Sequence, residues 1–251
     1  MNAVVAIVQG RMGSLRLPGK MLMDLSGEPL IMRTLKRAMA IPGVDVVVLA
    51  TTNLQEDNQL IEMAESAKIQ SFAGNPEDVL DRYYEAACKH GAKTIIRLTG
   101  DCPLLDPTVS TSVLSRFIQG DVDYVSNTNP PTFPDGLDTE VFSFDALHAA
   151  WREATLKSDR EHVTQFISRQ PERFKSANIS NHTDLSHLRW TVDEPEDFAF
   201  VRKVYKGLEK RGWQGHDLTQ LLQVIDDDDL EDASILHRRN EGLLKSLQTD
   251  I

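Results

Sequence analysis

The chain has 251 residues, 41% of them hydrophobic and 26% charged, which is typical of a globular protein large enough for one α/β domain. Its net charge of -11 argues against nucleic acid as a partner, and no apolar run is long enough to span a membrane. The apolar start is short and lacks a basic leader, and Cys88 and Cys102 form no metal or redox spacing, so we expect a reducing, cytoplasmic location.

Strand-like and helix-like patterns alternate along the first half of the chain. Apolar, β-branched runs predict strands at 4–9, 44–51, 70–72, 94–99 and 123–126. Amphipathic patterns predict helices between them, at 30–40, 57–68, 76–90 and 107–119. This alternation predicts a Rossmann-like, mainly parallel sheet with helices on both faces.

The second half is less regular. A turn-rich stretch leads to a predicted strand at 139–143, and a second strand is predicted at 187–192. Ser158 and Glu161 form a capping-box pattern that predicts a helix ending at Arg169. Another helix is predicted from Pro195 to about Lys210.

These patterns suggest how the chain is organised. We expect one domain over 1–225, with a small arm or lobe at about 130–181 inside it, and a helical C-terminal tail at 226–251. The acidic run at 226–229 is interpreted as the solvated N-terminus of that tail, where carboxylates favour the helix dipole.

The loop after the first predicted strand, QGRMGSLRLPGK, gathers glycines and basic residues against an acidic background. Glycines after a strand let backbone N–H groups approach phosphate oxygens, and arginine or lysine supplies the countercharge. The spacing excludes a Walker A loop, since five residues separate Gly13 from Gly19 and Met21 replaces the hydroxyl, and it does not fit a dinucleotide fingerprint. The loop therefore predicts another kind of phosphate binding, in preference to a plain surface turn. Its glycines and basic residues are Gly10, Gly13, Gly19, Arg11, Arg16 and Lys20.

Two aspartates follow predicted strands farther along the chain. Asp101 lies just past the strand at 94–99, and Asp193 lies between the strand at 187–192 and the next helix. Open α/β sheets bind ligands at the carboxyl ends of their strands, and Mg²⁺ favours carboxylates combined with substrate phosphates. The pair therefore predicts a Mg²⁺ site, although each aspartate alone could equally cap the turn or helix that follows it.

The motifs resemble one enzyme family. QGRMGSLRLPGKMLMDLSGEPLI resembles the opening motif of the CMP-sugar synthetases, the cytidylyltransferases that activate 3-deoxy-manno-octulosonate and sialic acids. TGDCPLLDP and TVDEPEDF resemble two further segments of that family. NPEDVLDRYYEAA and DREHVTQFI are similar to its SpsF-like branch, which serves spore-coat polysaccharide biosynthesis. The resemblance runs from about Val4 to Tyr205; Gln9-Gly10 and Cys102 depart from the pattern, which leaves the acceptor open.

The resemblance implies a Mg²⁺-dependent cytidylyltransferase that moves CMP from CTP to a sugar, an acidic one by preference, and releases pyrophosphate. It also implies a homodimer and assigns roles to particular residues. Arg11 and Lys20 would hold the triphosphate and, with Asp101, act in catalysis, and Asp101 and Asp193 would hold Mg²⁺. Further nucleotide contacts are expected from Gly10, Gly13, Ser14, Thr52 and Asn53.

Other polar residues are candidates for the acceptor. Asp138 and Glu140 lie in the turn-rich stretch and its strand, and Arg160 and His162 lie in REHV. For His162 the alternative is a structural histidine on a helix face. Arg82 is a further candidate, either as an ion-pair partner or as a residue that reaches the site.

Three other functions fit the same patterns. A GT-A glycosyltransferase shares this architecture and uses an Asp-x-Asp metal motif, which Asp121 and Asp123 match, although they precede a predicted strand. A nucleotidyltransferase could use another nucleoside triphosphate with a sugar 1-phosphate. A non-catalytic protein could bind the nucleotide alone.

Overall fold

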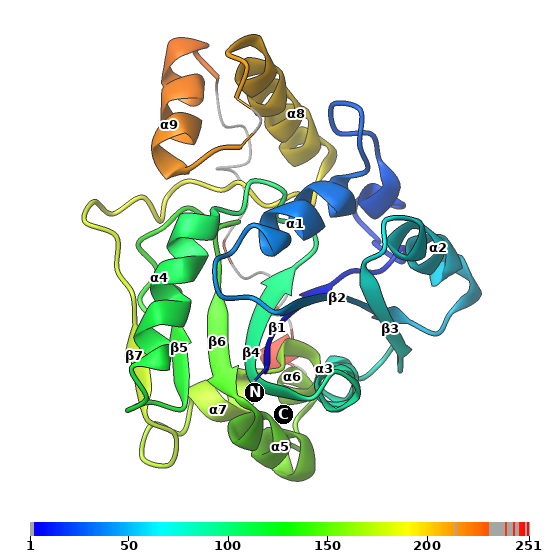
Figure 1. The fold of residues 1–251 in the computed structure, drawn as a ribbon, viewed down its shortest axis with the longest axis vertical. Coiled ribbons are helices and arrows are strands. Elements are labelled where there is room, and N and C mark those ends of the chain that lie inside the picture. Colours follow the sequence, from blue (N-terminus) through cyan, green and yellow to red (C-terminus); the bar gives the residue numbers. More distant parts are fainter. Residues whose placement is uncertain are drawn as a thin grey trace.

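The computed structural model describes residues 3–213 and 215–230, together with residues 239, 243, 246–248 and 250. Within this part the strands form one seven-stranded sheet in the order β3-β2-β1-β4-β6-β5-β7 (Figure 1). The first four strands pair in parallel, and β6 is antiparallel to both of its neighbours. The mainly parallel sheet is therefore confirmed. The strands are β1 (Ala3–Gln9), β2 (Val46–Thr52), β3 (Gln70–Gly74), β4 (Ala92–Thr99), β5 (Tyr124–Ser126), β6 (Glu140–Ser143) and β7 (Ser176–Asn178).

Helices cover both faces of the sheet. The α-helices are α1 (Leu30–Met39), α2 (Asn58–Ser66), α3 (Val79–Lys89), α4 (Pro107–Ile118), α5 (Phe144–Glu153), α6 (Lys157–His162), α7 (Gln165–Ser168), α8 (Pro195–Lys210) and α9 (Leu218–Asp227). Two 3₁₀ turns, η1 (Lys20–Leu22) and η2 (Gln55–Asp57), follow the first two strands. Alternate side chains of β1 point to opposite faces of the sheet and belong to two separate hydrophobic cores. Ala6 and Val8 pack with α1, α4 and α8, whereas Val5 and Ile7 pack with α3, α5 and α7.

The ends of β1 and β4 approach each other closely. The Gly100 backbone N–H donates to the Gln9 carbonyl oxygen over 2.7 Å, and a Cβ atom on Gly100 would lie 2.7 Å from that same oxygen. Only glycine fits there without a shift of the backbone. The residues just after Gln9 and Gly100 are therefore brought to the same edge of the sheet.

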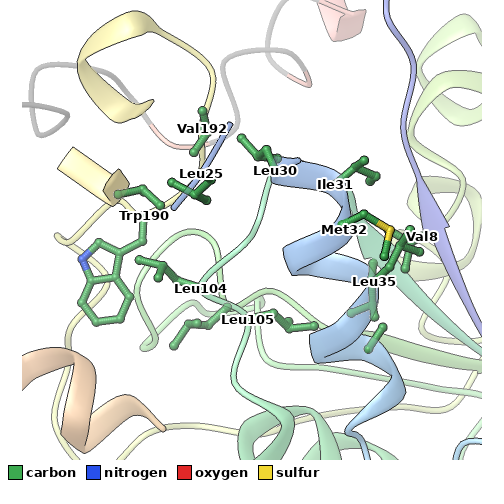
Figure 2. Close-up of a cluster of buried hydrophobic side chains, with 14 of the residues drawn as sticks. Val8, Leu25, Leu30, Ile31, Met32, Leu35, Leu104, Leu105, Trp190 and Val192 are labelled. Atoms are coloured by element: carbon green, nitrogen blue, oxygen red, sulfur yellow. The ribbon is translucent and has the colours of Figure 1, made fainter. Parts of the chain in front are cut away.

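The segment at 187–192 is not a strand, contrary to the prediction. Its single sheet-like contact is an isolated bridge between Arg189 and Asp135, and Trp190 and Val192 are fully buried. Figure 2 shows these two side chains beside Leu104 and the side chains of α1. The apolar pattern at 187–192 arises because an extended chain packs its side chains into the core, and such a chain needs no neighbouring strand. Asp193 accordingly follows an extended segment outside the sheet.

Other local predictions differ from the structure. The helix expected from Ser158 to Arg169 is broken at Val163, which adopts φ +61, and Ser158 lies inside α6 instead of capping it. The acidic run at 226–229 lies at the C-terminal end of α9, where Arg211 pairs with Asp227 and Asp228; the helix that it was expected to begin falls outside the described residues. Helix α5 and strand β7 were not predicted.

The segment expected to form an arm, 130–181, contributes β6 and β7 to the common sheet and α5, α6 and α7 to one of its faces. The expected tail helix falls mostly outside the described residues. No helix in the described part of the chain is both long enough and apolar enough to cross a membrane.

Candidate active site

Lys20 lies between the two aspartates that were predicted as a pair. Gly19 adopts φ 71 and allows the loop to turn into η1, which begins at Lys20 and points its side chain inward. The Lys20 ammonium Nζ lies 3.0 Å from Asp101 Oδ2 and 2.9 Å from Asp193 Oδ1, and it donates to the Val192 carbonyl oxygen over 2.7 Å. The loop and both aspartates therefore form one partly buried cluster, although they are far apart in the sequence.

The charges of this cluster stabilise one another. Burial disfavours the ammonium charge, but Asp101 and Asp193 raise the pKa of Lys20 above its usual value. Burial also opposes ionisation of Asp193, but the charges of Lys20 and Arg16 and a hydrogen bond from Arg189 lower its pKa to about 2. Both groups are thus charged at neutral pH.

The backbone of Asp193 is held in position by the side chain of Asp197. The Asp197 carboxylate accepts from the backbone N–H groups of Asp193 and Glu194, at 2.7 and 2.9 Å. This is one half of the capping box that opens α8. Glu194 is therefore the N-cap of α8 and Asp197 is its partner in the capping box, and the Asp193 side chain remains directed at Lys20 and the arginines.

The two carboxylates suit a divalent cation. They converge on a single positive charge, Lys20 Nζ, and Mg²⁺ prefers one or two protein carboxylates with substrate phosphates completing its ligands. Among the described residues, no cluster of three or more His, Cys, Asp or Glu side chains could hold a metal by itself. The residues therefore fit a metal that arrives together with a phosphate ligand.

A cavity of about 530 Å³ runs along the glycine loop. Five of the predicted nucleotide-contacting residues line it, namely Gly10, Arg11, Gly13, Ser14 and Lys20, together with the predicted residues Asp101 and His162. Five basic side chains face three carboxylates in its lining: Arg11, Arg16, Lys20, Arg82 and Lys157 against Glu77, Asp101 and Glu161. This excess of positive charge suits a polyanion such as a triphosphate.

Arg82 contributes to this cavity more directly than the sequence indicated. It is 3% exposed, and its Nη1 donates to the Asn75 carbonyl oxygen over 2.9 Å. Burial, with a smaller contribution from the charge of Arg11, lowers its pKa. The guanidinium groups of Arg11 and Arg82 thus both line the cavity and repel each other, and an anionic ligand would relieve this repulsion.

Asp57 fixes the glycine loop, and sequence reasoning did not single it out. It is fully buried and accepts from the backbone N–H of Met12 at 2.7 Å and of Thr52 at 3.1 Å, as well as from the Thr52 hydroxyl. The carboxylate therefore ties the loop to the end of β2. Thr52 and Asn53, predicted to contact the nucleotide, line neither cavity, and the Thr52 hydroxyl already bonds Asp57.

A second cavity, of about 300 Å³, begins where the first ends. Both are lined by Gln9, Arg16, Thr99, Asp101 and His162. Gln9 Oε1 is buried and has no hydrogen-bond partner in the described part of the protein. The carboxylates outnumber the basic groups in this lining: Asp101, Asp135, Asp138, Glu140 and Asp193 against Arg16, Arg97 and Arg189.

The predicted acceptor residues are distributed unevenly around this second cavity. Glu140 lines it but is already engaged, because it pairs with Arg97 and accepts from the Tyr124 and Thr164 hydroxyls at 2.5 and 2.6 Å. Asp138 also lines it, and burial raises its pKa to about 7 although Arg239 pairs with it.

The two predicted residues of α6 differ in their positions. His162 lines both cavities, and its pKa is lowered by burial and by the charge of Arg97. Arg160 lines neither cavity and instead binds Asp78 and the Trp151 carbonyl oxygen.

The Asp-x-Asp motif of the glycosyltransferase alternative lies away from both cavities. Asp121 pairs with Arg116, and Asp123 accepts from the backbone N–H of Lys175. Neither aspartate lines a cavity, so this motif does not support a glycosyltransferase metal site.

Comparison with known proteins agrees with the fold and identifies relatives of the chain. A cytidylyltransferase of Leptospira borgpetersenii superposes with a TM-score of 0.84 and 27% identity, over 96% of this chain and 99% of that one. The spore coat polysaccharide biosynthesis protein SpsF of Bacillus subtilis is 31% identical over 84% of this chain and 90% of that protein. A 3-deoxy-manno-octulosonate cytidylyltransferase of an Anaeromyxobacter species is 35% identical over 52% of each chain.

The fold is therefore that of the nucleotidyltransferases, with the glycine loop and Asp101 following the carboxyl ends of β1 and β4. The cytidylyltransferase family model matches residues 5–225. The chain belongs to the cytidylyltransferase family, as the resemblance of its motifs predicted.

Proposed function

We propose that this protein transfers CMP from CTP to a sugar hydroxyl, releases pyrophosphate, and serves the biosynthesis of a surface polysaccharide or glycan. One observation carries the proposal: Lys20, Asp101 and Asp193 form a charged cluster where a basic cavity along the glycine loop meets a second, carboxylate-rich cavity. Membership of the cytidylyltransferase family supports CTP as the nucleotide, and the similarity to SpsF supports a role in polysaccharide biosynthesis.

The basic cavity is the site for CTP. Arg11 and Arg82 lie on the side where the β- and γ-phosphates would bind, and the backbone around Gly13 and Ser14 faces the same space. Positive groups here offset the charge that grows on the departing pyrophosphate, which is where nucleotidyl transfer is accelerated. We also retain Thr52 and Asn53 as candidates for base or ribose contacts, since their backbone borders the loop that Asp57 holds.

Asp101 is the group best placed to act on both substrates, because it is the carboxylate among the five residues that line both cavities. Together with Asp193 it would hold Mg²⁺. When bound, Mg²⁺ supplies charge for the α-phosphate and favours ionisation of the attacking hydroxyl. The Lys20 side chain is flexible. With Mg²⁺ bound to the two carboxylates, its ammonium would donate to phosphate oxygens instead.

The second cavity is the site for the sugar. Its carboxylates, threonines and Gln9 can bind hydroxyl groups, and Asp138 and His162 are predicted residues in its lining. An acidic sugar would find Arg16, Arg97 and Arg189 in the lining, where it would compete with the protein's own carboxylates for them. Acidic sugars are the first acceptors to test, as one relative is named for 3-deoxy-manno-octulosonate.

We further propose that the protein acts in the cytoplasm and as a homodimer. Its substrates are CTP and a small sugar, with no nucleic acid or membrane as partner. These proposals follow from the family resemblance and from the composition of the chain.

The proposal is tested by incubating the protein with CTP, MgCl₂ and a panel of acidic, neutral and phosphorylated sugars, and measuring pyrophosphate and nucleoside diphosphate. We expect pyrophosphate together with a new phosphodiester signal in ³¹P NMR. Asp101→Asn is the control and should abolish both. Release of nucleoside diphosphate in place of pyrophosphate would contradict the proposal and favour a glycosyltransferase.

A further inference from the structure

Gln9 is the last residue of β1, and the sheet fixes its backbone on both sides. It is aligned with Ala50 of β2 and with Thr99 of β4, and its carbonyl oxygen accepts from the Gly100 N–H. Ile7, two residues earlier, points to the face of the sheet that α3, α5 and α7 cover. Because side chains alternate along a strand, the Gln9 side chain points to that same face.

The side-chain oxygen of Gln9 is a vacant hydrogen-bond acceptor. Oε1 is buried and accepts no hydrogen bond from any described residue, and the residue lines both cavities. A buried polar atom without a partner destabilises a fold, so such an atom beside a cavity indicates a group that a ligand completes. The terminal torsion of glutamine is soft, so a rotation can turn this oxygen toward the cavities without breaking a hydrogen bond to it.

The place of Gln9 indicates which ligand supplies the missing donor. Gln9 shares both cavities with Asp101, the residue that the α-phosphate of CTP would face. Phosphate oxygens carry no proton to donate at this point, whereas the hydroxyl groups of the acceptor do. An amide oxygen is too weak a base to take the proton of the attacking hydroxyl, so its partner is a neighbouring group of the acceptor.

We propose that Gln9 is a specificity-determining residue for the acceptor, and that its side-chain oxygen accepts a hydrogen bond from a hydroxyl beside the attacking hydroxyl. This assignment rests on the proposed function, which places CTP in one cavity and the sugar in the other. It defines the acceptor as a vicinal diol, with one hydroxyl reacting and the adjacent hydroxyl bound by Gln9.

The vacant oxygen gives a first test that needs no substrate. Gln9→Met keeps the length of the side chain and removes its polar group, so the ligand-free variant should melt about 2–4 °C above wild type. Gln170→Met is the matched control, because Gln170 Nε2 donates to the Phe166 carbonyl oxygen over 2.6 Å, and its melting temperature should fall. A fall of the same size in Gln9→Met would show that the amide is satisfied in the free protein, and would overturn the proposal.

A second test uses CTP, MgCl₂ and the acceptor that yields pyrophosphate in the sugar panel. Gln9→Met should raise the KM for the acceptor about tenfold, the effect of one lost hydrogen bond, and leave the KM for CTP within about twofold of wild type. Gln170→Met should change neither. With an acceptor analogue that lacks the neighbouring hydroxyl, wild type and Gln9→Met should have similar KM values, because the hydrogen bond is absent in both.

The failures of this inference and of the proposed function are distinguishable. An unchanged acceptor KM in Gln9→Met, or a tenfold rise in the KM for CTP, would overturn the role of Gln9 while pyrophosphate release by wild type still supports cytidylyl transfer. Release of nucleoside diphosphate by wild type would count against the proposed function. The melting temperatures of Gln9→Met and Gln170→Met decide whether the amide is vacant in either case.

Discussion

Replacing Lys20 with alanine removes the charge that holds two carboxylates together. Lys20 is 5% exposed, and its ammonium bonds Asp101, Asp193 and a backbone carbonyl. Removing one partner of a buried ion pair costs about 3–5 kcal/mol, because the remaining charges stay buried. The carboxylate side chains are 23% and 19% exposed, and Asp193 keeps Arg16 and Arg189, so we expect the low end, about 3 kcal/mol.

The free energy of unfolding of Lys20→Ala and of wild type is measured by urea unfolding, with circular dichroism as the signal. A loss of about 3 kcal/mol corresponds to a fall in melting temperature of roughly 6–12 °C for a chain of this size. Lys36→Ala is the control, because Lys36 is a half-exposed lysine paired with Glu28 at the surface, and it should cost less than about 1 kcal/mol. A change below 1 kcal/mol in Lys20→Ala would refute the reasoning.

Magnesium and pH separate the electrostatic contribution of Lys20 from packing. Without the ammonium the two carboxylates are free to bind a cation, so MgCl₂ should raise the melting temperature of Lys20→Ala more than that of wild type. Asp193, with a folded pKa of about 2 and an unfolded value near 3.9, stabilises wild type by about 2 kcal/mol above pH 4. That contribution is lost as the pH falls toward 2, and the loss should be smaller in the variant. Identical responses would contradict the account.

Activity and binding give three further predictions. With a working acceptor, Lys20→Ala should lower kcat and kcat/KM together by about two powers of ten or more. Asp101→Asn and Asp193→Asn should each abolish turnover in folded protein. If either aspartate variant keeps near-normal activity at saturating Mg²⁺, the role of that aspartate is structural. Asp57→Ala should lower stability by about 2 kcal/mol and raise the KM for CTP, because the Met12 and Thr52 backbone N–H groups lose their acceptor; an unchanged KM would separate the loop from nucleotide binding. CTP with Mg²⁺ should raise the melting temperature more than ATP, GTP or UTP, and equal shifts would remove the cytidine preference.

The core of the fold was predictable because its signal is local. Strands buried on both faces are mostly apolar along their length, so the runs at 4–9, 44–51 and 94–99 identified β1, β2 and β4. The loop chemistry was equally visible, since glycines and basic residues stood together after β1. Asp101 could be placed because it directly follows a well-predicted strand.

What the sequence could not show depends on distant contacts. Lys20 and Asp193 are 173 positions apart, and nothing near either residue indicates that they pair. The break at Val163 accompanies a bond from the Thr164 hydroxyl to the buried Glu140, another long-range interaction. Arg82 and Asp57 matched ordinary helix patterns, and only their burial beside the glycine loop distinguished them.

The most direct test of the account is a crystal structure with CTP and Mg²⁺, because the central claim divides nucleotide and sugar between two cavities. We predict the triphosphate along the glycine loop, contacting Arg11, Arg82 and Lys20, with the α-phosphorus facing Asp101 and the cavity lined by Asp138 and His162 left for the acceptor. A triphosphate bound in that second cavity, or away from Lys20, would contradict the account.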